Sequence, residues 1–360
     1  MMDRLENFDG DDLAKYIKPP KIKIFGIGGA GNNIIERLYV GNINGVETIA
    51  LNTDATHLSR TKASVRKVIG AESCKGRGAG GDPHVGRRAA EETEDDLKEY
   101  IEDSDMVFVI AGMGGGTGTG AAPVIAKMAT EMEKLVIGVT ILPFKVEGAI
   151  KRKVAKDGVL ELKENCDTVI ELDNENLNEF ETTQQNYSVD RTFGVMSDLV
   201  TNMVKELSEI ITLPSVINVD YADINKVLRV GGRSKIMYGH SNNSDPGSVI
   251  DSLLGNPLIG GDYQGSERVV LHIQAGNEFT LRSYHEIVGA LSMNLSENNH
   301  MISGYRLDPE MGNAVKVVMI VSAIPDDDDG DVLGSAFVDN SDSGPGPDNY
   351  GNALGIPMVN

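Results

Sequence analysis

Residues 112–120 read GMGGGTGTG, and this run of glycines is the most informative stretch of the sequence about its fold. Glycine loses more conformational entropy on folding than any other residue and packs no side chain, so such a run must serve a purpose. The segment before it, 105–111, is short, apolar and β-branched, which is typical of a buried strand. The segment after it has helical spacing, with Pro123 near the expected start. Backbone N–H groups and the positive end of a helix dipole then face one point, so the stretch predicts a phosphate-binding loop rather than a flexible linker.

The composition of the 360 residues indicates a globular protein of about two domains. The formal net charge of −21 argues against nucleic acid or an anionic membrane surface as the main partner. Cys74 and Cys166 are too few for a disulfide scaffold or a zinc site, so we expect a reducing cytoplasm. The N-terminus has no apolar core like that of a signal peptide, and no window approaches the roughly 18 apolar residues of a membrane span. We therefore expect a cytoplasmic protein without direct membrane insertion.

Apolar strands alternate with helical segments over the first half of the chain. The expected elements are a charged helix over 87–103 and strands over 21–28, 46–55, 105–111 and 135–144. Strands alternating with helices predict an α/β fold with an open, mostly parallel, Rossmann-like sheet. We assign this nucleotide-binding domain to 21–189 and a polar arm to 1–20.

The second half begins with the longest helical pattern in the chain. Residues 190–212 carry one continuous apolar stripe and are followed by a proline, so they predict a long central helix. Beyond it, 213–324 predicts a smaller α+β domain, with two helical stretches between strands at 268–276 and 314–324. Residues 325–360 contain many aspartates with glycine, serine and proline, which predicts a disordered acidic tail.

A second glycine-rich loop occurs near the start of the chain. The segment GIGGAG at 26–31 matches G-x-G-x-x-G directly after a strand, and Asp54 lies 23 residues beyond Gly31. Alone, this motif suggests a dinucleotide with Asp54 on its ribose, and it leaves an NAD-dependent oxidoreductase as one hypothesis. Two such loops aimed at one sheet edge suit a triphosphate better than a single pyrophosphate. A P-loop is excluded because the sequence contains no G-x-x-x-x-G-K-[ST].

The motifs around these loops resemble those of the tubulin/FtsZ superfamily. The resemblance rests on GMGGGTGTGAAP together with GIGGAGNN, ALNTDA, GRGAGGDP, LPFKVEG and INVDYAD, which occur in the family's order over 21–324. It implies a Rossmann-like GTPase domain, a long central helix and a smaller C-terminal domain. It also implies GTP and GDP as ligands, Mg²⁺ as the accompanying cation, and head-to-tail filaments that act in cell division at the division site.

The resemblance also assigns nucleotide contacts residue by residue. It places the first phosphate loop at Gly28, Gly29, Ala30, Gly31 and Asn32, and the loop for the β- and γ-phosphates at Gly114, Gly115, Gly116, Thr117, Gly118 and Thr119. Glu147 would reach the ribose, Phe193 would stack on guanine, and further contacts fall on Asn52, Asp54, Gly80, Lys151 and Asn174. Asp198 would accept guanine N1–H and N2–H₂, two adjacent donors that adenine lacks. No residue is assigned as a metal ligand.

One position departs from the family pattern. The family usually carries arginine four residues after the glutamate of its E-G motif, whereas this chain has Lys151, followed by Arg152. Lysine keeps the positive charge but loses the planar fork of donors. The contact with phosphate or ribose would then be looser, or Arg152 would take it over.

Asn218, Asp220 and Asp223 follow the predicted central helix and are the catalytic residues that the resemblance implies. Two acids in a loop would ordinarily suggest a solvated turn. If Phe193 stacks on the base, however, the helix runs about 33 Å before the chain reaches Asn218. The acids then cannot reach the nucleotide of their own subunit and must orient water at that of the next. Such a heterologous contact does not close on itself, so it propagates as a filament.

Two further hypotheses remain open from the sequence. A GTP-dependent scaffold or shape-determining paralogue would polymerise but turn over little nucleotide, and Lys151 leaves room for it. The last residues, GNALGIPMVN, carry an apolar cluster that could dock on a membrane-tethering division protein, as C-terminal peptides of the family do.

Overall fold

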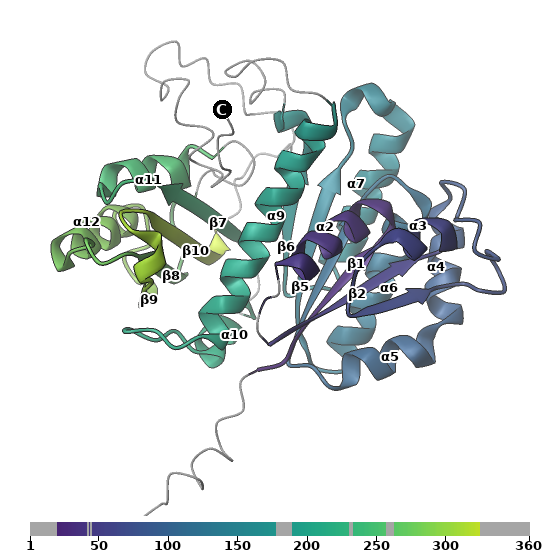
Figure 1. Cartoon of the computed structure of the whole chain (residues 1–360), viewed down its shortest axis with the longest axis horizontal. Coiled ribbons are helices and arrows are strands. Elements are labelled where there is room, and N and C mark those ends of the chain that lie inside the picture. The colour runs from purple at the N-terminus through teal and green to yellow at the C-terminus, as the bar shows by residue number, and fades with distance from the viewer. Residues whose placement is uncertain are drawn as a thin grey trace, which may run out of the picture.

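The computed structural model describes residues 20–177 apart from 42 and 44, and residues 189–229, 233–256 and 263–324, without the side chains of 189–193 and 233. The tail predicted over 325–360, and the arm predicted over 1–20 except its last residue, lie outside these ranges. Figure 1 shows two bodies, each built on a sheet, with one long helix between them.

The larger body contains a six-stranded sheet with the strand order β3-β2-β1-β4-β5-β6. The strands are β1 (Ile22–Ile27), β2 (Val46–Asn52), β3 (Val65–Val68), β4 (Met106–Gly112), β5 (Leu135–Leu142) and β6 (Thr168–Asp173). Every neighbouring pair is parallel, so all carboxyl ends lie at one edge. The sequence analysis did not predict β3 and β6, which are short and carry charged residues among their apolar ones.

Helices cover both faces of this sheet, which is why its central strands are apolar at nearly every position. One face packs against α2 (Gly28–Val40), α3 (Ala55–Arg60) and the long helix α9. The other packs against α4 (Pro83–Glu92), α5 (Glu94–Glu102), α6 (Gly116–Glu131) and α7 (Ala149–Lys163). The two-sided burial fixes the sheet as the core of the domain.

The single charged helix predicted over 87–103 is wrong, because α4 and α5 divide at Thr93. The Thr93 hydroxyl donates to the Ala89 carbonyl at 2.9 Å and accepts from the Gly70 amide at 3.1 Å. The second bond ties the junction to a loop outside both helices. The first helix also begins earlier than predicted, since Asp82 caps it and Pro83 occupies its first position.

The long helix α9 (Val189–Thr212) is the central helix expected over 190–212. Its 24 residues span about 36 Å. Its buried face forms one stripe, made of Met196, Leu199, Val200, Met203, Val204, Leu207 and Ile210. These residues belong to one hydrophobic cluster with side chains from both sheets, so α9 joins the two bodies through apolar contacts.

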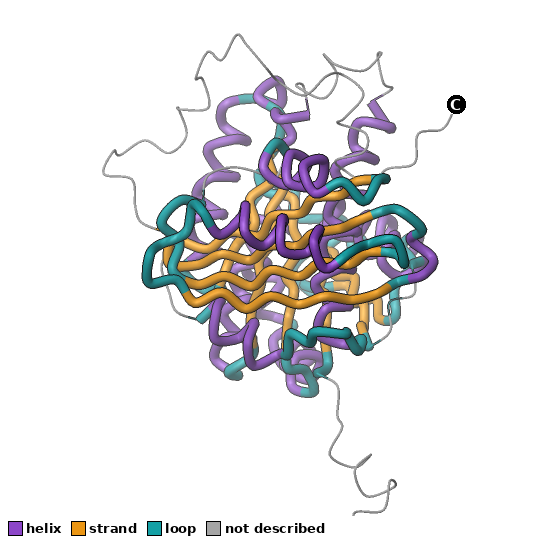
Figure 2. The backbone as a smooth tube through the Cα atoms, turned by 90° about the vertical axis from the view of Figure 1, so that its left-hand side faces the viewer, coloured by secondary structure: helices purple, strands orange, loops and turns teal. Residues whose placement is uncertain are grey.

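The smaller body contains a four-stranded sheet with the order β7-β10-β8-β9. Its elements are α10 (Tyr221–Leu228), β7 (Arg233–Ser241), α11 (Pro246–Leu254), β8 (Arg268–Ala275), α12 (Leu281–Ser292), β9 (His300–Leu307) and β10 (Val315–Ile324). β10 runs antiparallel to β7 and β8, whereas β8 and β9 are parallel. Figure 2 views the molecule from the side of this body and shows its strands side by side.

Of the two helical stretches predicted between 268–276 and 314–324, one is α12, whereas the second is wrong because the edge strand β9 and a 3₁₀ turn follow α12 there. The sequence of β9 mixes polar and apolar residues, since one side of the strand has no neighbouring strand in the sheet. β7 was also not predicted. None of the helices in the described ranges combines the length and apolar character that a membrane span needs.

Candidate active site

The two glycine-rich loops meet at the carboxyl ends of neighbouring strands. β1 pairs with β4, and Ile27 lies opposite Ala111 just before the two loops. A Cβ placed on Gly28 would lie 3.2 Å from the Gly118 nitrogen, so the loops touch. A third segment joins them after β2, where the Thr53 and Thr117 hydroxyls lie 2.7 Å apart. We call this the glycine edge of the sheet.

The glycines of 112–120 serve two different purposes. Gly114 has a φ of +91°, and its N–H donates to the Thr119 hydroxyl at 2.8 Å, which closes a tight loop. A Cβ on Gly115 would meet nothing within 4 Å, so this position borders open space. A Cβ on Gly120, in contrast, would lie 1.9 Å from the Pro83 carbonyl oxygen. The later glycines therefore allow close helix packing, and the earlier ones shape the loop.

The placement of Pro123 near the helix start is wrong. α6 begins at Gly116, so the loop is shorter than 112–120 and the proline lies about two turns inside the helix. Because glycine has a low helix propensity, the segment was predicted as a loop. In the structure its small residues let α6 pack closely against α4, so the helix begins earlier. That N-terminus places unpaired backbone N–H groups at the glycine edge, where an anion would bind.

Two residues predicted to contact the nucleotide, Asn32 and Asn52, are buried below the glycine edge. Asn32 is fully buried, and its amide, in the orientation that satisfies both ends, donates to the Gly26 and Leu51 carbonyls and accepts from Asn52. The Asn52 side-chain oxygen accepts from the Asp54 amide at 3.1 Å. These asparagines brace β1 and β2 from within.

Two other predicted nucleotide contacts are Asp54, which has hydrogen bonds of its own, and Gly80. The Asp54 carboxylate caps α3 by accepting from the amides of Thr56 and His57, at 2.8 and 3.1 Å. Gly80 has a φ of +60° with open space at its Cβ position. Both follow the same edge of the sheet, so they border the loops described above.

Asn174 lies at the start of the 3₁₀ turn that follows β6, and it is buried. Its side-chain oxygen has no hydrogen-bond partner among the described residues. An unpaired buried acceptor costs about 1–3 kcal/mol, so this oxygen suits a ligand N–H. Guanine offers such donors.

The other residues assigned to the base lie on α9. Asp198 forms an ion pair with Arg37 of α2. Both side chains are partly exposed, so the carboxylate lies at the surface between α2 and α9. The side chain of Phe193 lies outside the described residues.

Glu147 and Lys151 form an ion pair of 2.5 Å at the start of α7. A Cβ on Gly114 would lie 2.8 Å from the Lys151 carbonyl oxygen, so this turn lies against the phosphate loop. Arg152 points elsewhere: it pairs with Asp173 and donates to the Pro143 carbonyl at 2.7 Å. The bond to Asp173 raises the pKa of Arg152. The takeover of the Lys151 role by Arg152 is therefore not supported.

The predicted acids lie at the start of α10. Asp220 accepts from the Asp223 amide at 2.9 Å, and Asp223 accepts from the Asp220 amide at 3.4 Å, which forms a capping box. The Asn218 side chain accepts from the Ser215 amide at 2.8 Å. Asn218 and Asp220 are exposed and Asp223 is half-buried.

These acids lie at the amino edge of the large sheet, opposite the glycine edge. The Tyr221 hydroxyl donates to the carbonyl of Asp105, which directly precedes β4, at 2.8 Å. Arg229, just after α10, donates to the Glu133 carbonyl before β5 at 2.9 Å. The seven residues of β4 span about 23 Å, so the Tyr221–Asp105 contact lies roughly that far from the loop after β4. We call this the acid edge.

Comparison with known proteins assigns the chain to a family. A model of the Tubulin/FtsZ family GTPase domain matches residues 21–182, and a model of the FtsZ family C-terminal domain matches residues 232–325. Cell division protein FtsZ 2 of Methanocaldococcus jannaschii is 40% identical over 321 residues, which cover 87% of this chain and 83% of that protein. The chain belongs to the FtsZ family. It is therefore a tubulin-like GTPase, and the NAD-dependent oxidoreductase hypothesis is wrong.

Solved structures agree with the FtsZ assignment. The M. jannaschii structure titled "FtsZ dimer, empty" matches with a TM-score of 0.79 and 36% identity, over 88% of this chain and 93% of that one. CetZ2 from Haloferax volcanii matches with a TM-score of 0.70 at 19% identity, over 85% of this chain and 93% of that one, and shows a shared fold alone. The FtsZ relatives thus leave the hypothesis of a scaffold paralogue less favoured.

Sequence analysis of this FtsZ-family chain missed two residues that shape the edges. Thr53 binds Thr117 across the loops, and its place between two assigned residues, Asn52 and Asp54, could have drawn attention to it. Tyr221 anchors α10 to the large sheet. Its position one residue after Asp220 carried no recognisable signal, because the partner is a backbone carbonyl far away in the sequence.

Proposed function

We propose that this FtsZ-family chain binds GTP at the glycine edge and hydrolyses it with Asp220 and Asp223 of the next subunit in a head-to-tail filament. The observation that carries the proposal is the separation of the two edges by the length of β4. A subunit with loops at one end and acids at the other can complete its site only by stacking. The activity belongs to a cytoskeletal GTPase of cell division, and the site of action would be the division site in the cytoplasm.

The glycine edge supports triphosphate binding through its backbone. Gly115 borders open space, and the α6 N-terminus directs its N–H groups there. The unpaired Asn174 oxygen would accept from the guanine base. The Thr117 hydroxyl, which the buried Thr53 hydroxyl holds in place, is an oxygen donor at this edge, as Mg²⁺ requires. Mg²⁺ bound with the nucleotide would supply charge neutralisation at the phosphates.

At the ribose, Glu147 would accept hydroxyl hydrogens while Lys151 holds its carboxylate in place. At the base, Asp198 would exchange its ion pair with Arg37 for the guanine N–H groups. Phe193 would stack on the base, and the remaining assigned residues brace the loops. These roles come from the family resemblance and from the position of each residue.

The acids would act on the attacking water. Asp220 and Asp223 would accept its hydrogens and orient its oxygen for in-line attack on the γ-phosphate, and Asn218 would order the loop around them. The backbone N–H groups of the glycine edge would stabilise the charge that develops on the phosphate oxygens. Loss of the γ-phosphate removes part of the contact between subunits, so turnover would weaken the filament.

Self-association is the partner interaction that this arrangement needs. The dimer named in the M. jannaschii structure supports it by similarity. The apolar cluster in the last ten residues would bind a membrane-tethering division protein, although it lies outside the described residues.

A complementation experiment tests the shared site. Asp223→Ala removes an acid and keeps the nucleotide loops, whereas Gly114→Val disrupts the loop, since φ is +91° and a Cβ meets the Lys151 carbonyl at 2.8 Å, and keeps the acids. Each variant alone should release little phosphate. A mixture should recover GTP turnover, because the acids of one chain act on the GTP of the other.

The matched control is a mixture of Asp223→Ala with Asp220→Ala, in which every acid edge is defective. It should stay inactive at the same total concentration. A silent first mixture, or full turnover by dilute wild-type monomers, would contradict the proposal.

A further inference from the structure

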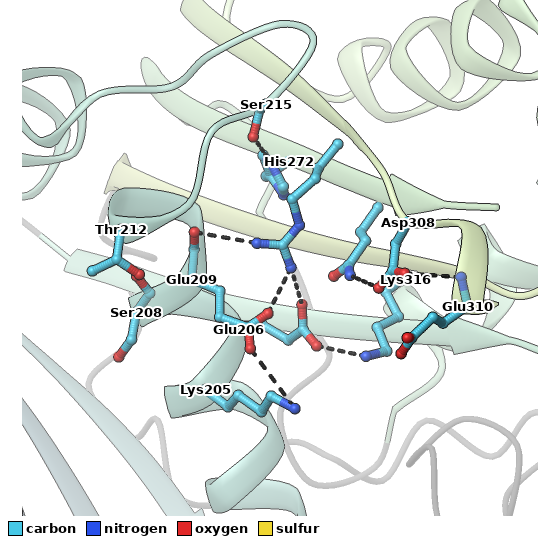
Figure 3. Close-up of polar contacts among 12 residues, drawn as sticks. Lys205, Glu206, Ser208, Glu209, Thr212, Ser215, His272, Asp308, Glu310 and Lys316 are labelled. Atoms are coloured by element: carbon cyan, nitrogen blue, oxygen red, sulfur yellow. Dashed lines mark hydrogen bonds and ion pairs between the residues drawn. The ribbon is translucent and has the colours of Figure 1, made fainter. Parts of the chain in front are cut away.

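A buried polar cluster joins the end of the central helix to the C-terminal sheet. It contains Glu206 and Glu209 of α9, Arg306 of β9 and Lys316 of β10. Arg306 is 7% exposed and Glu206 3% exposed. Figure 3 shows Glu206 and Glu209 of α9 and Lys316 of β10 converging in one place. We call these four residues the clamp.

Arg306 makes the most extensive contacts in the clamp. Its guanidinium donates to the Glu209 carboxylate at 2.6 Å and to the Glu209 backbone carbonyl at 3.2 Å, and it lies 4.0 Å from Glu206. Lys316 contacts Glu206 at 2.6 Å. The planar fork of Arg306 therefore fixes the last turn of α9 in one orientation, whereas Lys316 acts as a point charge.

The same strand also contacts the loop over residues 213–220, which we call the acid loop; it ends at Asp220 and leads into α10, where Asp223 lies. Ile217 and Tyr305 exchange both backbone hydrogen bonds, at 3.1 and 3.0 Å. Tyr305 directly precedes Arg306, and Ile217 lies three residues before Asp220. Two adjacent residues of β9 thus bind Glu209, just before the loop, and Ile217 within it.

A neighbouring strand adds a third contact to this loop. The His272 ring on β8 lies 3.4 Å from the Ser215 hydroxyl, and the Ser215 amide donates to Asn218. Figure 3 shows Ser215 and His272 next to each other above the clamp. The loop therefore takes its shape from the C-terminal sheet.

Burying a cation between two carboxylates is a poor way to gain stability. The desolvation penalty offsets much of the attraction, and apolar residues of similar volume often stabilise as well. What such a network does supply is one defined geometry between the parts that it joins, because each buried donor must meet its partner. Here the joined parts are α9, the loop and β9.

We propose that Arg306 is a positioning residue, which sets the acid loop by clamping Glu209 beside the Tyr305–Ile217 backbone pair so that Asp220 and Asp223 reach the next subunit in a productive orientation. This rests on the proposed function of the two acids. The contacts of Arg306 are with Glu206 and Glu209 of α9, so it would act through the loop rather than on the nucleotide. Its loss would disturb hydrolysis but leave the distant glycine edge intact.

The experiment compares Arg306→Met and Arg306→Lys with Lys316→Met, which removes the other cation of the clamp and contacts no residue of the acid loop. GTP turnover, GTP affinity, GTP-dependent sedimentation and thermal stability are measured for each. We expect Arg306→Met to lower kcat about tenfold or more, with GTP affinity and sedimentation within about twofold of wild type. Arg306→Lys should recover part of kcat, and Lys316→Met should keep kcat within about twofold while losing similar thermal stability.

Asp223→Ala, alone and combined with Arg306→Met, separates the possible outcomes. If Asp223→Ala keeps a measurable residual turnover and the double variant is no slower than Asp223→Ala alone, Arg306 acts through the acids; a further tenfold loss in the double variant would contradict this. Equal loss of kcat in Arg306→Met and Lys316→Met, in proportion to lost stability, would overturn the positioning role. Normal turnover in Arg306→Met would overturn it too. Full turnover in Asp223→Ala would overturn the proposed function itself. If Arg306→Met does not fold, Arg306→Lys and Glu209→Gln give the same readouts.

Discussion

The two edges of the large sheet are built by opposite means. At the glycine edge the functional surface is backbone, shaped by the positive φ of Gly114 and open at Gly115. At the acid edge the surface is side chains, and bonds from two separate sheets hold them. Tyr221 ties α10 to the residue before β4, and Ile217 pairs with Tyr305 of β9.

The glycine edge is specified by short runs of sequence, whereas the acid edge depends on contacts between segments that only the whole fold brings together. The Tyr221–Asp105 and Arg306–Glu209 contacts join residues 116 and 97 positions apart. The glycine loops, in contrast, are short contiguous runs. Substitutions at the acid edge should therefore lower kcat with little effect on GTP binding, whereas those at the glycine edge should lower GTP affinity.

The largest effect is expected for Asp223→Ala. Its carboxylate would orient the attacking water, so phosphate release should fall about 10³-fold or more, which corresponds to about 4 kcal/mol in the barrier. GTP affinity, measured by equilibrium binding of a fluorescent GTP analogue, should stay within about twofold. Because Asp223 also belongs to the α10 capping box, Asp223→Asn is the control that keeps an acceptor for the Asp220 amide. Turnover near wild type in Asp223→Asn would assign the acid a structural role.

Gly115→Ala tests the other edge, with the second-largest effect. The backbone there is extended, with φ of −94° and ψ of 172°, and a Cβ has no neighbour within 4 Å, so thermal stability should be unchanged. GTP affinity should fall roughly 100-fold, about 2.7 kcal/mol, because the methyl group would occupy phosphate space. Isothermal titration calorimetry measures the affinity. Unchanged affinity would place the phosphates elsewhere.

The glycine edge was largely predictable because strand, loop and helix signals follow one another in the sequence. Both turns from strand to helix lie within GIGGAG and GMGGGTGTG, although the helices begin earlier than predicted, α2 at Gly28 and α6 at Gly116. The exact start of α6 was not predictable, because glycines that serve helix packing look like glycines that form a loop. The burial of Asn32 was also hidden, since a motif names a residue without stating which way its side chain points.

The acid edge was predictable only in part. The resemblance identified Asn218, Asp220 and Asp223, and the length of the central helix placed them far from the loops. Nothing in the sequence paired Arg306 with Glu209, because β9 is a mixed edge strand with weak periodicity. Contacts between distant segments need the topology that brings the strands together.

A somewhat smaller effect than that of Gly115→Ala is expected for the pH dependence of stability, which reports on His272 beside the acid loop. Burial, with the Arg306 charge nearby, lowers the pKa of His272 to about 4 from an ordinary value near 6.5. Between these values the unfolded chain binds the proton and the folded chain does not. Stability from His272 is therefore complete above pH 6.5 and falls as pH drops toward 4, by about 2 kcal/mol between pH 7 and pH 5.

His272→Asn removes that titration and keeps a polar partner for Ser215. The free energy of unfolding, measured by urea denaturation at pH 7 and pH 5, should drop less for the variant than for wild type. Equal drops in both proteins would show that another group carries the acid sensitivity. No such dependence on His272 is expected for GTP affinity, since His272 contacts Ser215 of the loop that leads to the acids and not the glycine edge.

The smallest effect, and the one that tests the glycine edge most directly, is expected for Asn174→Leu. The Asn174 oxygen is buried and unpaired among the described residues, so replacing it with an apolar side chain of similar size should raise the free energy of unfolding by about 1 kcal/mol. GTP affinity should fall about tenfold, or about 1.4 kcal/mol, because the guanine N–H loses its acceptor. Urea denaturation and nucleotide titration on the same preparation check the two signs. If Asn174 served packing alone, its replacement would lower the free energy of unfolding and leave GTP affinity unchanged. A higher free energy of unfolding together with lower GTP affinity would mark Asn174 as a binding residue that destabilises the fold.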